Sequence, residues 1–256
     1  MRNFLIFVFN LIIKCSHDNM LERAAGLTLR VLLAFFPFLI FLMSLMGFLE
    51  LDIDAILGGL YAVLPDDASD LVAYFITQLS ATRSGGILSA ALFFSVYNTT
   101  NGFRAVISYT NRSYDVEDRR GFFARVGLSF ALTLIFTAAL IIMLALLVFW
   151  RHWLSLIAAL FVLFIFTSFI YKLACSKPLP ARHIFPGAVV TVFAWVIASY
   201  AVGLITQNFS QLPAIYGSFA GVFVLILWIN TVAVVLLVGN EINAMLHEFD
   251  AADILQ

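Results

Sequence analysis

The chain has 256 residues, of which 63% are hydrophobic and 11% are charged. Soluble domains carry roughly 25% charged residues, so this composition excludes an ordinary soluble protein and predicts a chain that folds in lipid. The 14 Lys and Arg residues balance 15 Asp and Glu residues. Because this balance gives no general attraction to polyanions, we expect no nucleic-acid partner.

The first residues combine a basic side chain with a short apolar segment, Phe4 to Ile13. This pattern resembles a signal peptide, but the following Lys14-Cys15-Ser16 offers no small-x-small cleavage site. The segment is also too short to cross about 30 Å of hydrocarbon. We therefore predict a helix that lies in the inner membrane interface.

Windows with few or no charged residues recur along the rest of the chain, and each is long enough to cross a bilayer at about 1.5 Å per residue. The last window, residues 184–240, has no charged side chain and is divided by the polar segment 207–213. The pattern predicts an all-α membrane helix bundle with six transmembrane helices in one integral membrane domain, residues 1–256. The expected spans are 31–49, 85–107, 126–150, 153–171, 184–206 and 214–238.

The basic residues predict the orientation of these helices. Twelve of the fourteen Lys and Arg residues fall on one side of the expected spans, and only Arg83 and Arg151 fall on the other. Because positive loops are retained in the cytoplasm, both termini are expected there. Cys15 and Cys175 then lie near the cytoplasmic face, where thiols stay reduced, and no disulfide is expected.

The first external loop is the longest and is acidic. Its apolar residues recur at helical spacing on both sides of Pro65, which predicts two short amphipathic helices on the outer surface. These helices either cap the bundle or form a lid over an outward opening.

Motifs of catalysis and of cofactor binding are missing from the sequence. There is no His-Glu-x-x-His, no Gly-x-Ser-x-Gly, no Walker loop and no Rossmann fingerprint, and the four histidines are scattered over separate loops or helix ends. We therefore expect neither an enzyme nor a metal or cofactor site.

Neutral polar residues cluster in two of the expected spans. Asn98, Thr99, Thr100 and Asn101 lie about 18 Å below the outer end of the second span, and Asn230 with Thr231 lies about 21 Å below the outer end of the sixth. We expect the two clusters to face one another, either as interhelical hydrogen bonds or as the lining of a polar cavity. Helix shape is expected to depend on proline and small residues, namely Pro37, Pro186, Gly187 and Gly217.

Two further groups of charged residues lie at the inner boundary. Glu241 is costly so near hydrocarbon without a partner such as Arg104 or Arg30, and it serves either in a structural ion pair or in a substrate or gating role. A basic cluster of Arg112, Arg119, Arg120 and Arg125 either sets the orientation alone or also attracts an anionic lipid headgroup.

Three segments resemble the YihY/virulence factor BrkB family, formerly mislabelled ribonuclease BN. They are Ala24-Ala25-Gly26-Leu27 leading to Phe35-Phe36-Pro37, Asn111-Arg112-Ser113-Tyr114 with Arg119-Arg120, and Pro186-Gly187-Ala188 with Ile215-Tyr216-Gly217-Ser218 and Gly239-Asn240-Glu241-Ile242-Asn243. Leu29-Arg30 departs from the tyrosine pair common in the family, and Asn230 and Asn240 also depart from it. The resemblance implies a multi-pass protein of the bacterial inner membrane with six helices and a poorly defined activity, and it adds Tyr216 and Asn243 to the candidate site residues.

The favoured function is a transporter, or a protein that translocates lipids or other amphiphiles. Membrane lipids, including anionic headgroups at the cytoplasmic face, are the expected partners, and a homo-oligomer is compatible with the sequence. The alternative is a scaffold or envelope assembly factor, for which the acidic outer loop and the tail residues Glu248, Asp250 and Asp253 would be contact surfaces. A membrane-associated enzyme, such as the old ribonuclease label, is less favoured because RNA cleavage needs acid-base or metal groups.

Overall fold

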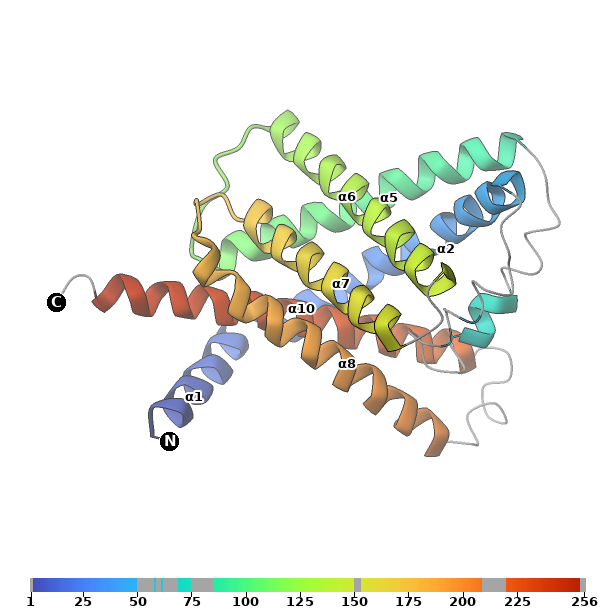
Figure 1. The fold of residues 1–256 in the computed structure, drawn as a ribbon. Helices are drawn as coiled ribbons and strands as arrows, with labels where there is room; N and C mark the ends of the chain where they lie inside the picture. Colours follow the sequence, from blue (N-terminus) through green and yellow to red (C-terminus); the bar gives the residue numbers. More distant parts are fainter. Residues whose placement is uncertain are drawn as a thin grey trace.

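The structure is a computed structural model of residues 1–256, and it describes residues 2–49, 58, 61, 69–74, 85–149, 153–208 and 220–253. Helices account for nearly all of the described residues, and no strand occurs among them, which confirms the all-α prediction (Figure 1). The helices are α1 (Arg2–His17), α2 (Met20–Leu49), α5 (Gly85–Ser113), α6 (Phe122–Phe149), α7 (Trp153–Ala174), the 3-10 helix η1 (Ala181–His183), α8 (Phe185–Asn208) and α10 (Ala220–Asp253).

Five of these helices, α2, α6, α7, α8 and α10, are long and apolar enough to cross a membrane. The expected second span falls in α5, which has 29 residues but lower mean hydropathy, because polar residues such as Asn98 and Asn101 interrupt it. The presence of six transmembrane helices therefore stays a prediction. Several helices also extend beyond their predicted spans: α2 begins at Met20 rather than at residue 31, and α10 ends at Asp253 rather than at 238.

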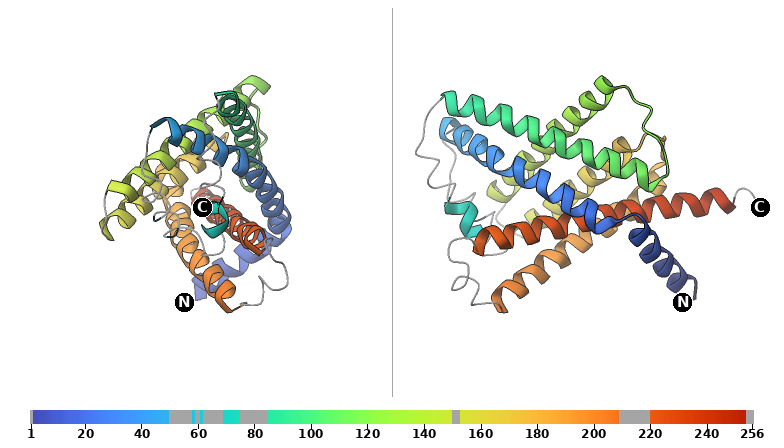
Figure 2. Two further views of the ribbon diagram at one scale, coloured as in Figure 1. Left: turned by 90° about the vertical axis from the view of Figure 1, so that its right-hand side faces the viewer. Right: turned by 180° about the vertical axis from the view of Figure 1, so that it is seen from behind.

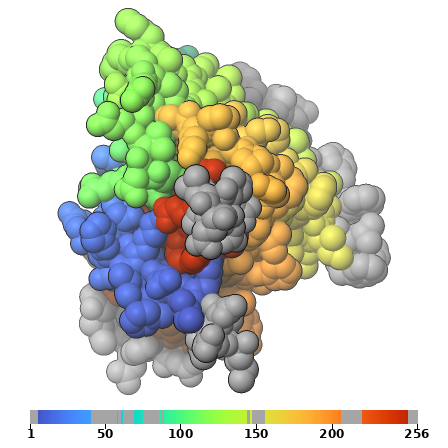
Figure 3. All heavy atoms as spheres, turned by 90° about the vertical axis from the view of Figure 1, so that its left-hand side faces the viewer, coloured from blue at the N-terminus to red at the C-terminus, as the bar shows by residue number. Residues whose placement is uncertain are grey.

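The start of α1, the end of α10 and the connections that follow α5 and α7 lie at one end of the bundle (Figure 1). We call this the terminal end. A topology with both chain termini on the same side of a membrane requires such an arrangement, although the cytoplasmic orientation of this end stays a prediction. Seen from this end, the last part of α10 lies in the middle, and three parts of the chain lie around it: helices α1 and α2, the α5–α6 connection, and the start of α8 (Figure 3).

The helices pack against one another in a series that begins at α10. The helix α10 packs against α8 and α2, and α2 in turn lies along α5, as the view from behind shows (Figure 2). Helices α6 and α7 complete the bundle next to α5. Large side chains such as Leu132, Tyr171 and Leu225 are buried, whereas Phe193 and Ile197 on α8 are each more than 60% exposed. Such an apolar exterior is expected of a bundle whose solvent is lipid.

Two glycines allow α8 and α10 to cross at close range. A Cβ atom on Gly187 would lie 2.5 Å from the Asn243 side chain and would also collide with the Gly239 carbonyl oxygen. The Asn243 Oδ1 accepts a hydrogen bond of 2.7 Å from the Gly187 backbone N–H. Because the first N–H groups of a helix have no partner within it, Asn243 of α10 caps the start of α8. Pro186 occupies the first turn of α8 and lacks an N–H that would need such a partner.

The N-terminal helix α1 leaves the bundle at an angle (Figure 1). The break between α1 and α2 is made at Asn19, whose φ of 49° is tolerated better by Asn than by most residues. Contacts of Phe7 with Phe249 and of Lys14 with Glu248 hold α1 against α10. Its exposed face is apolar, including Phe9 and Ile12, and its position in a membrane interface stays a prediction.

Some predicted features fall on residues that the structure does not describe. In the loop that is expected to be external, residues 69–74 are helical and Val72 is buried, but most of the two expected amphipathic helices lies outside the described residues. Tyr216, Gly217 and the predicted start of the sixth span at 214–219 also lie outside them. The choice between a cap and a lid therefore stays open. Pro37 lies inside α2, which continues to Leu49.

Candidate functional site

A cavity of about 840 Å³ lies between α2, α5 and the start of α6, next to the α5–α6 connection. We call it the arginine groove, because four arginines are among the residues that line it. The lining comprises Arg30, Leu33, Asn98, Asn101, Arg104, Ala105, Ile107, Ser108, Tyr109, Asn111, Arg112, Asp115, Val116, Glu117, Asp118, Arg125 and Ser129. Its volume falls within the range of roughly 300–1,000 Å³ that is common for ligand sites.

Helical periodicity places the polar lining on one face of α5. Asn98, Asn101, Arg104, Ser108 and Arg112 follow one another at intervals of three or four residues, which is the spacing of a single helix face. Asn98 and Arg112 are 14 positions apart, so this polar stripe runs along about 21 Å of helix axis. The part from Asn98 to the end of the expected span at residue 107 covers about 14 Å, roughly half of a hydrocarbon core of about 30 Å, whereas Ser108 and Arg112 lie beyond that span.

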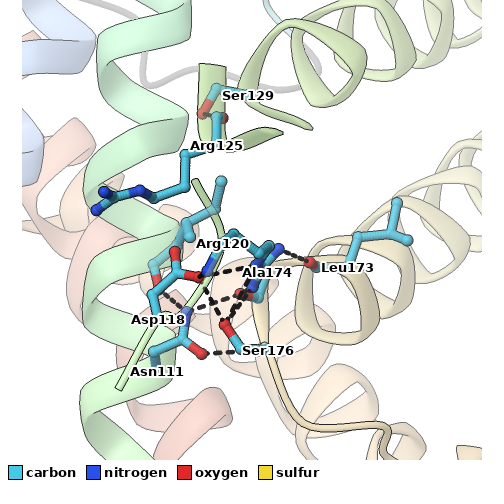
Figure 4. Close-up of polar contacts among 9 residues, drawn as sticks. Asn111, Asp118, Arg120, Arg125, Ser129, Leu173, Ala174 and Ser176 are labelled. Atoms are coloured by element: carbon cyan, nitrogen blue, oxygen red, sulfur yellow. Dashed lines mark hydrogen bonds and ion pairs between the residues drawn. The ribbon is translucent and has the colours of Figure 1, made fainter. Parts of the chain in front are cut away.

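The charges in the groove are largely unpaired. Within the described part of the chain, Arg30, Arg112 and Arg125 form no ion pair, and Arg104 lies over the ring of Phe122 at 5.6 Å. In Figure 4 the Arg125 side chain points toward α5 and away from the neighbouring hydrogen-bond network. These guanidinium groups are therefore available to bind an anionic group.

Arg120 has a different role, because it caps the C-terminus of α7 (Figure 4). Its guanidinium donates to the backbone carbonyls of Leu173 and Ala174 at 3.1 and 2.7 Å and to the Ser176 hydroxyl at 2.7 Å. A cation at a helix C-terminus satisfies free carbonyls and complements the helix dipole. Arg120 thus stabilises the fold at this position.

Asp118 joins Arg120 to the same network. Its Oδ1 accepts hydrogen bonds from the Arg120 Nε at 2.9 Å and from the Ser176 hydroxyl at 2.9 Å. Burial alone would raise the pKa of the Asp118 carboxyl, but a hydrogen bond from the Arg120 backbone N–H, the bonds from the Ser176 hydroxyl and the Arg120 side chain, and the Arg120 charge together lower its pKa below the usual value. Asn111 completes the junction, since its Oδ1 accepts from the Ser176 N–H at 2.7 Å.

The structure divides the predicted basic cluster. Arg112 and Arg125 line the groove, Arg120 holds the end of α7, and the exposed Arg119 is not part of the lining. Two members of the predicted cluster, Arg112 and Arg125, are therefore placed in the groove, and their headgroup role stays a prediction. Arg30 and Arg104 join them, and both were considered from sequence only as partners for Glu241.

The two clusters of neutral polar residues are not brought together. Asn98 and Asn101 line the groove, whereas the Asn230 side chain donates to the Thr28 hydroxyl at 3.1 Å in a separate cavity of about 360 Å³ between α2 and α10. The expectation that they face one another is therefore wrong, because α2 lies between α5 and this face of α10. Thr99 does not line the groove, and Thr100 lies 3.4 Å from the Thr133 hydroxyl of α6.

Glu241 is fully buried and lies outside the groove lining. The charge nearest to it is the Lys14 ammonium of α1, with 3.6 Å between Nζ and Oε1, so the expected partners Arg30 and Arg104 were wrong. Burial lowers the pKa of Lys14, but its hydrogen bond with Glu248 and the charges of Glu241 and Glu248 raise that pKa overall. Asn243 is committed to the start of α8, and a substrate or gating role for Glu241 stays a prediction.

Two histidines are closer together than their sequence positions suggested. His183 of η1 and His247 of α10 are 3.1 Å apart between their Nδ1 atoms. Within the described ranges, no group of three or more His, Cys, Asp or Glu side chains is placed to hold a metal ion. Cys15 and Cys175 are free thiols, and burial raises the pKa of Cys15 to about 11.

Comparison with known proteins places these features in a family. A family model described as Virulence factor BrkB matches residues 11–254. A Bacillus subtilis protein named ribonuclease-like protein YfkH is 32% identical over 247 residues, covering 89% of this chain and 90% of its own length.

Two relatives are UPF0761 membrane proteins. One from Alteromonas mediterranea is 32% identical over 81 residues, which cover 32% of this chain and 28% of that protein. One from Psychrobacter sp. is 24% identical over an alignment of 276 positions that covers 98% of this chain and 50% of that protein. No solved structure matches the chain at a significant level.

Proposed function

This chain belongs to the virulence factor BrkB family, and we propose that it moves phospholipids or similar amphiphiles between the leaflets of the bacterial cytoplasmic membrane. In this proposal the polar headgroup passes along the arginine groove while the acyl tails stay in the bilayer. No bond is made or broken. The ribonuclease-like name belongs to YfkH, and none of the residues that line the groove is a histidine that could serve RNA cleavage.

The observation that carries this proposal is the length of the polar stripe on α5. A headgroup that enters hydrocarbon loses its hydration, and this loss is the main barrier to lipid movement between leaflets. Side chains from Arg112 to Asn98 supply hydrogen-bond donors and acceptors along about 21 Å of the helix. The groove therefore lowers that barrier over about half of the membrane thickness, from the surface at Arg112 as far as Asn98.

The surfaces beside the groove suit the acyl tails. Leu33 lies in the groove and is 56% exposed, while Phe93 and Tyr97 on α5 are 66% and 59% exposed and stack on one another. Apolar side chains exposed next to a polar groove allow an amphiphile to contact both at once.

The arginines of the groove would attract the lipid headgroup at the expected cytoplasmic end. Basic residues at a membrane surface attract anionic lipid by about 1 kcal/mol each. Arg112 and Arg125 are exposed and without ion-pair partners among the described residues, so they are suited to hold a phosphate at the entrance. Of the tail residues considered for the scaffold alternative, Glu248 forms an ion pair with Lys14 within the same chain.

The test is a translocation assay in proteoliposomes that contain phospholipids labelled on an acyl tail with a fluorophore, with dithionite added outside to bleach the exposed leaflet. We expect bleaching beyond one leaflet with the wild type, and loss of that excess in the double variant Asn98→Leu, Asn101→Leu. Thr99→Val is the matched control, because Thr99 lies at the same depth on α5 outside the groove. Wild-type bleaching equal to that of protein-free liposomes would refute the proposal and favour a scaffold.

A further inference from the structure

We propose that the arginine groove prefers phospholipid headgroups that carry a phosphate and an ammonium group together, as phosphatidylethanolamine does, over headgroups that are only anionic. This inference rests on the function proposed above and specifies its substrate. It comes from the acidic side chains that share the cavity with the arginines, which a site for plain anions would not need.

The acidic part of the groove is the connection between α5 and α6. Asp115, Glu117 and Asp118 all line the cavity. Asp118 is engaged by Arg120 and Ser176, whereas Asp115 and Glu117 form no ion pair within the described ranges and are exposed. Two carboxylates are therefore available in the same cavity as the free guanidinium groups.

The backbone turn at the end of α5 holds side chains of opposite charge close together. The turn at the end of α5 is closed by a hydrogen bond of 3.1 Å from the Asp115 N–H to the Arg112 carbonyl oxygen, with Asp115 at a φ of 50°. Arg112 and Asp115 thus project from one tight turn, yet no ion pair joins them. Arg30 and Arg125 are held by two other helices.

A ligand with both charges can satisfy both groups of side chains. Guanidinium groups bind the oxygens of a phosphate in a forked geometry, and an ammonium group with N–H donors binds carboxylates. In phosphatidylethanolamine these groups are separated by two methylene groups, so one headgroup can reach both sides of a turn. An anionic headgroup without an amine would bind the arginines but would be repelled by Asp115 and Glu117.

The inference is tested with tail-labelled phosphatidylethanolamine and phosphatidylglycerol, whose headgroups are unmodified, in the same translocation assay. We expect the wild type to move the amine-bearing lipid roughly fivefold faster, the size expected of two partly exposed charge contacts. The double variant Asp115→Asn, Glu117→Gln should bring the two rates close to equality. Glu22→Gln is the matched control, because Glu22 is an exposed carboxylate outside the groove, and it should keep the wild-type ratio.

The outcomes separate this inference from the function on which it rests. Equal wild-type rates for the two lipids, or a ratio that survives the double variant, would overturn the headgroup preference and leave translocation standing. Movement of neither lipid by the wild type would overturn the proposed function itself. Translocation of phosphatidylglycerol by the double variant above the protein-free rate shows that this variant is folded.

Discussion

Replacing Gly187 with alanine should destabilise the bundle strongly, because this position is where α8 and α10 approach most closely. The new Cβ would collide with the Gly239 carbonyl oxygen and lie 2.5 Å from the Asn243 side chain. The first of these is backbone and cannot rotate away. Overpacking typically costs about 1–3 kcal/mol, and loss of the hydrogen bond between Gly187 and Asn243 adds about 1 kcal/mol. We expect a loss of about 2–4 kcal/mol.

The assay is reversible unfolding in mixed micelles with increasing SDS, followed by circular dichroism. Gly203→Ala in the same helix is the matched control, because a Cβ there would meet no atom within 4 Å. Alanine is the better helix former by about 0.5–1 kcal/mol, so the control should be as stable as the wild type or slightly more stable. If Gly187→Ala unfolded at the same SDS concentration as Gly203→Ala, the close crossing would be refuted.

Three further predictions follow from the ionisable groups at the terminal end. The pKa of Asp118 is lowered in the folded state, so its contribution to stability is complete above about pH 4, the ordinary pKa, and is lost as the pH falls through the lowered pKa. Asp118→Asn should therefore weaken the loss of stability in acid, measured by SDS unfolding at stepped pH. An unchanged acid profile would contradict the network with Arg120. Because the Cys15 thiol has a pKa of about 11, iodoacetamide should alkylate it slowly at pH 8 in the folded protein and at the normal rate after denaturation. Peptide mass spectrometry measures both rates, and equal rates in the two states would argue against its burial. Lys14→Met should lower the stability, because it leaves the buried Glu241 without its ion-pair partner. Adding Glu241→Gln to this variant should restore part of the lost stability. Additive losses in this double-mutant cycle would count against the pair.

The apolar helices were predictable because their signal is local. Long windows without charge are costly to expose to water, so the spans in α6, α7, α8 and α10 follow from composition alone. The helix ends were less predictable. The expected spans end where charged residues begin, whereas helical hydrogen bonding continues into the charged segments. The helix α2 starts at Met20 for this reason, 11 residues before the predicted span. The low hydropathy of α5 has its own cause, since its polar residues form one face of the groove.

The site was predictable only in part. Asn98 and Asn101 were identified as polar residues within a span, and counting onward by three or four would have added Arg104, Ser108 and Arg112 as a continuous stripe. The role of Arg120 could not be read from its neighbours, because the carbonyl groups that it binds at the end of α7 lie more than 50 residues away. The partner of Glu241 was misassigned for a similar reason.

Long-range pairs of this kind depend on how helices cross. Lys14 reaches Glu241 because α1 packs on the last part of α10. Nothing in the local sequence of either helix specifies that contact, and several other basic residues at the terminal end were equally plausible partners. Hydrophobic periodicity tells which face of a helix is buried, but not which helix covers it.

The most direct test of the groove as a headgroup path is photocrosslinking in proteoliposomes with a phospholipid that carries a diazirine on its headgroup, followed by peptide mass spectrometry. A matched lipid with the diazirine on its tail reports the apolar exterior. The account predicts that the headgroup probe labels α5 from Arg112 as far as Asn101 and Asn98, well inside the expected membrane span. Headgroup labelling confined to surface residues such as Arg119, with none between Asn98 and Ser108, would contradict it.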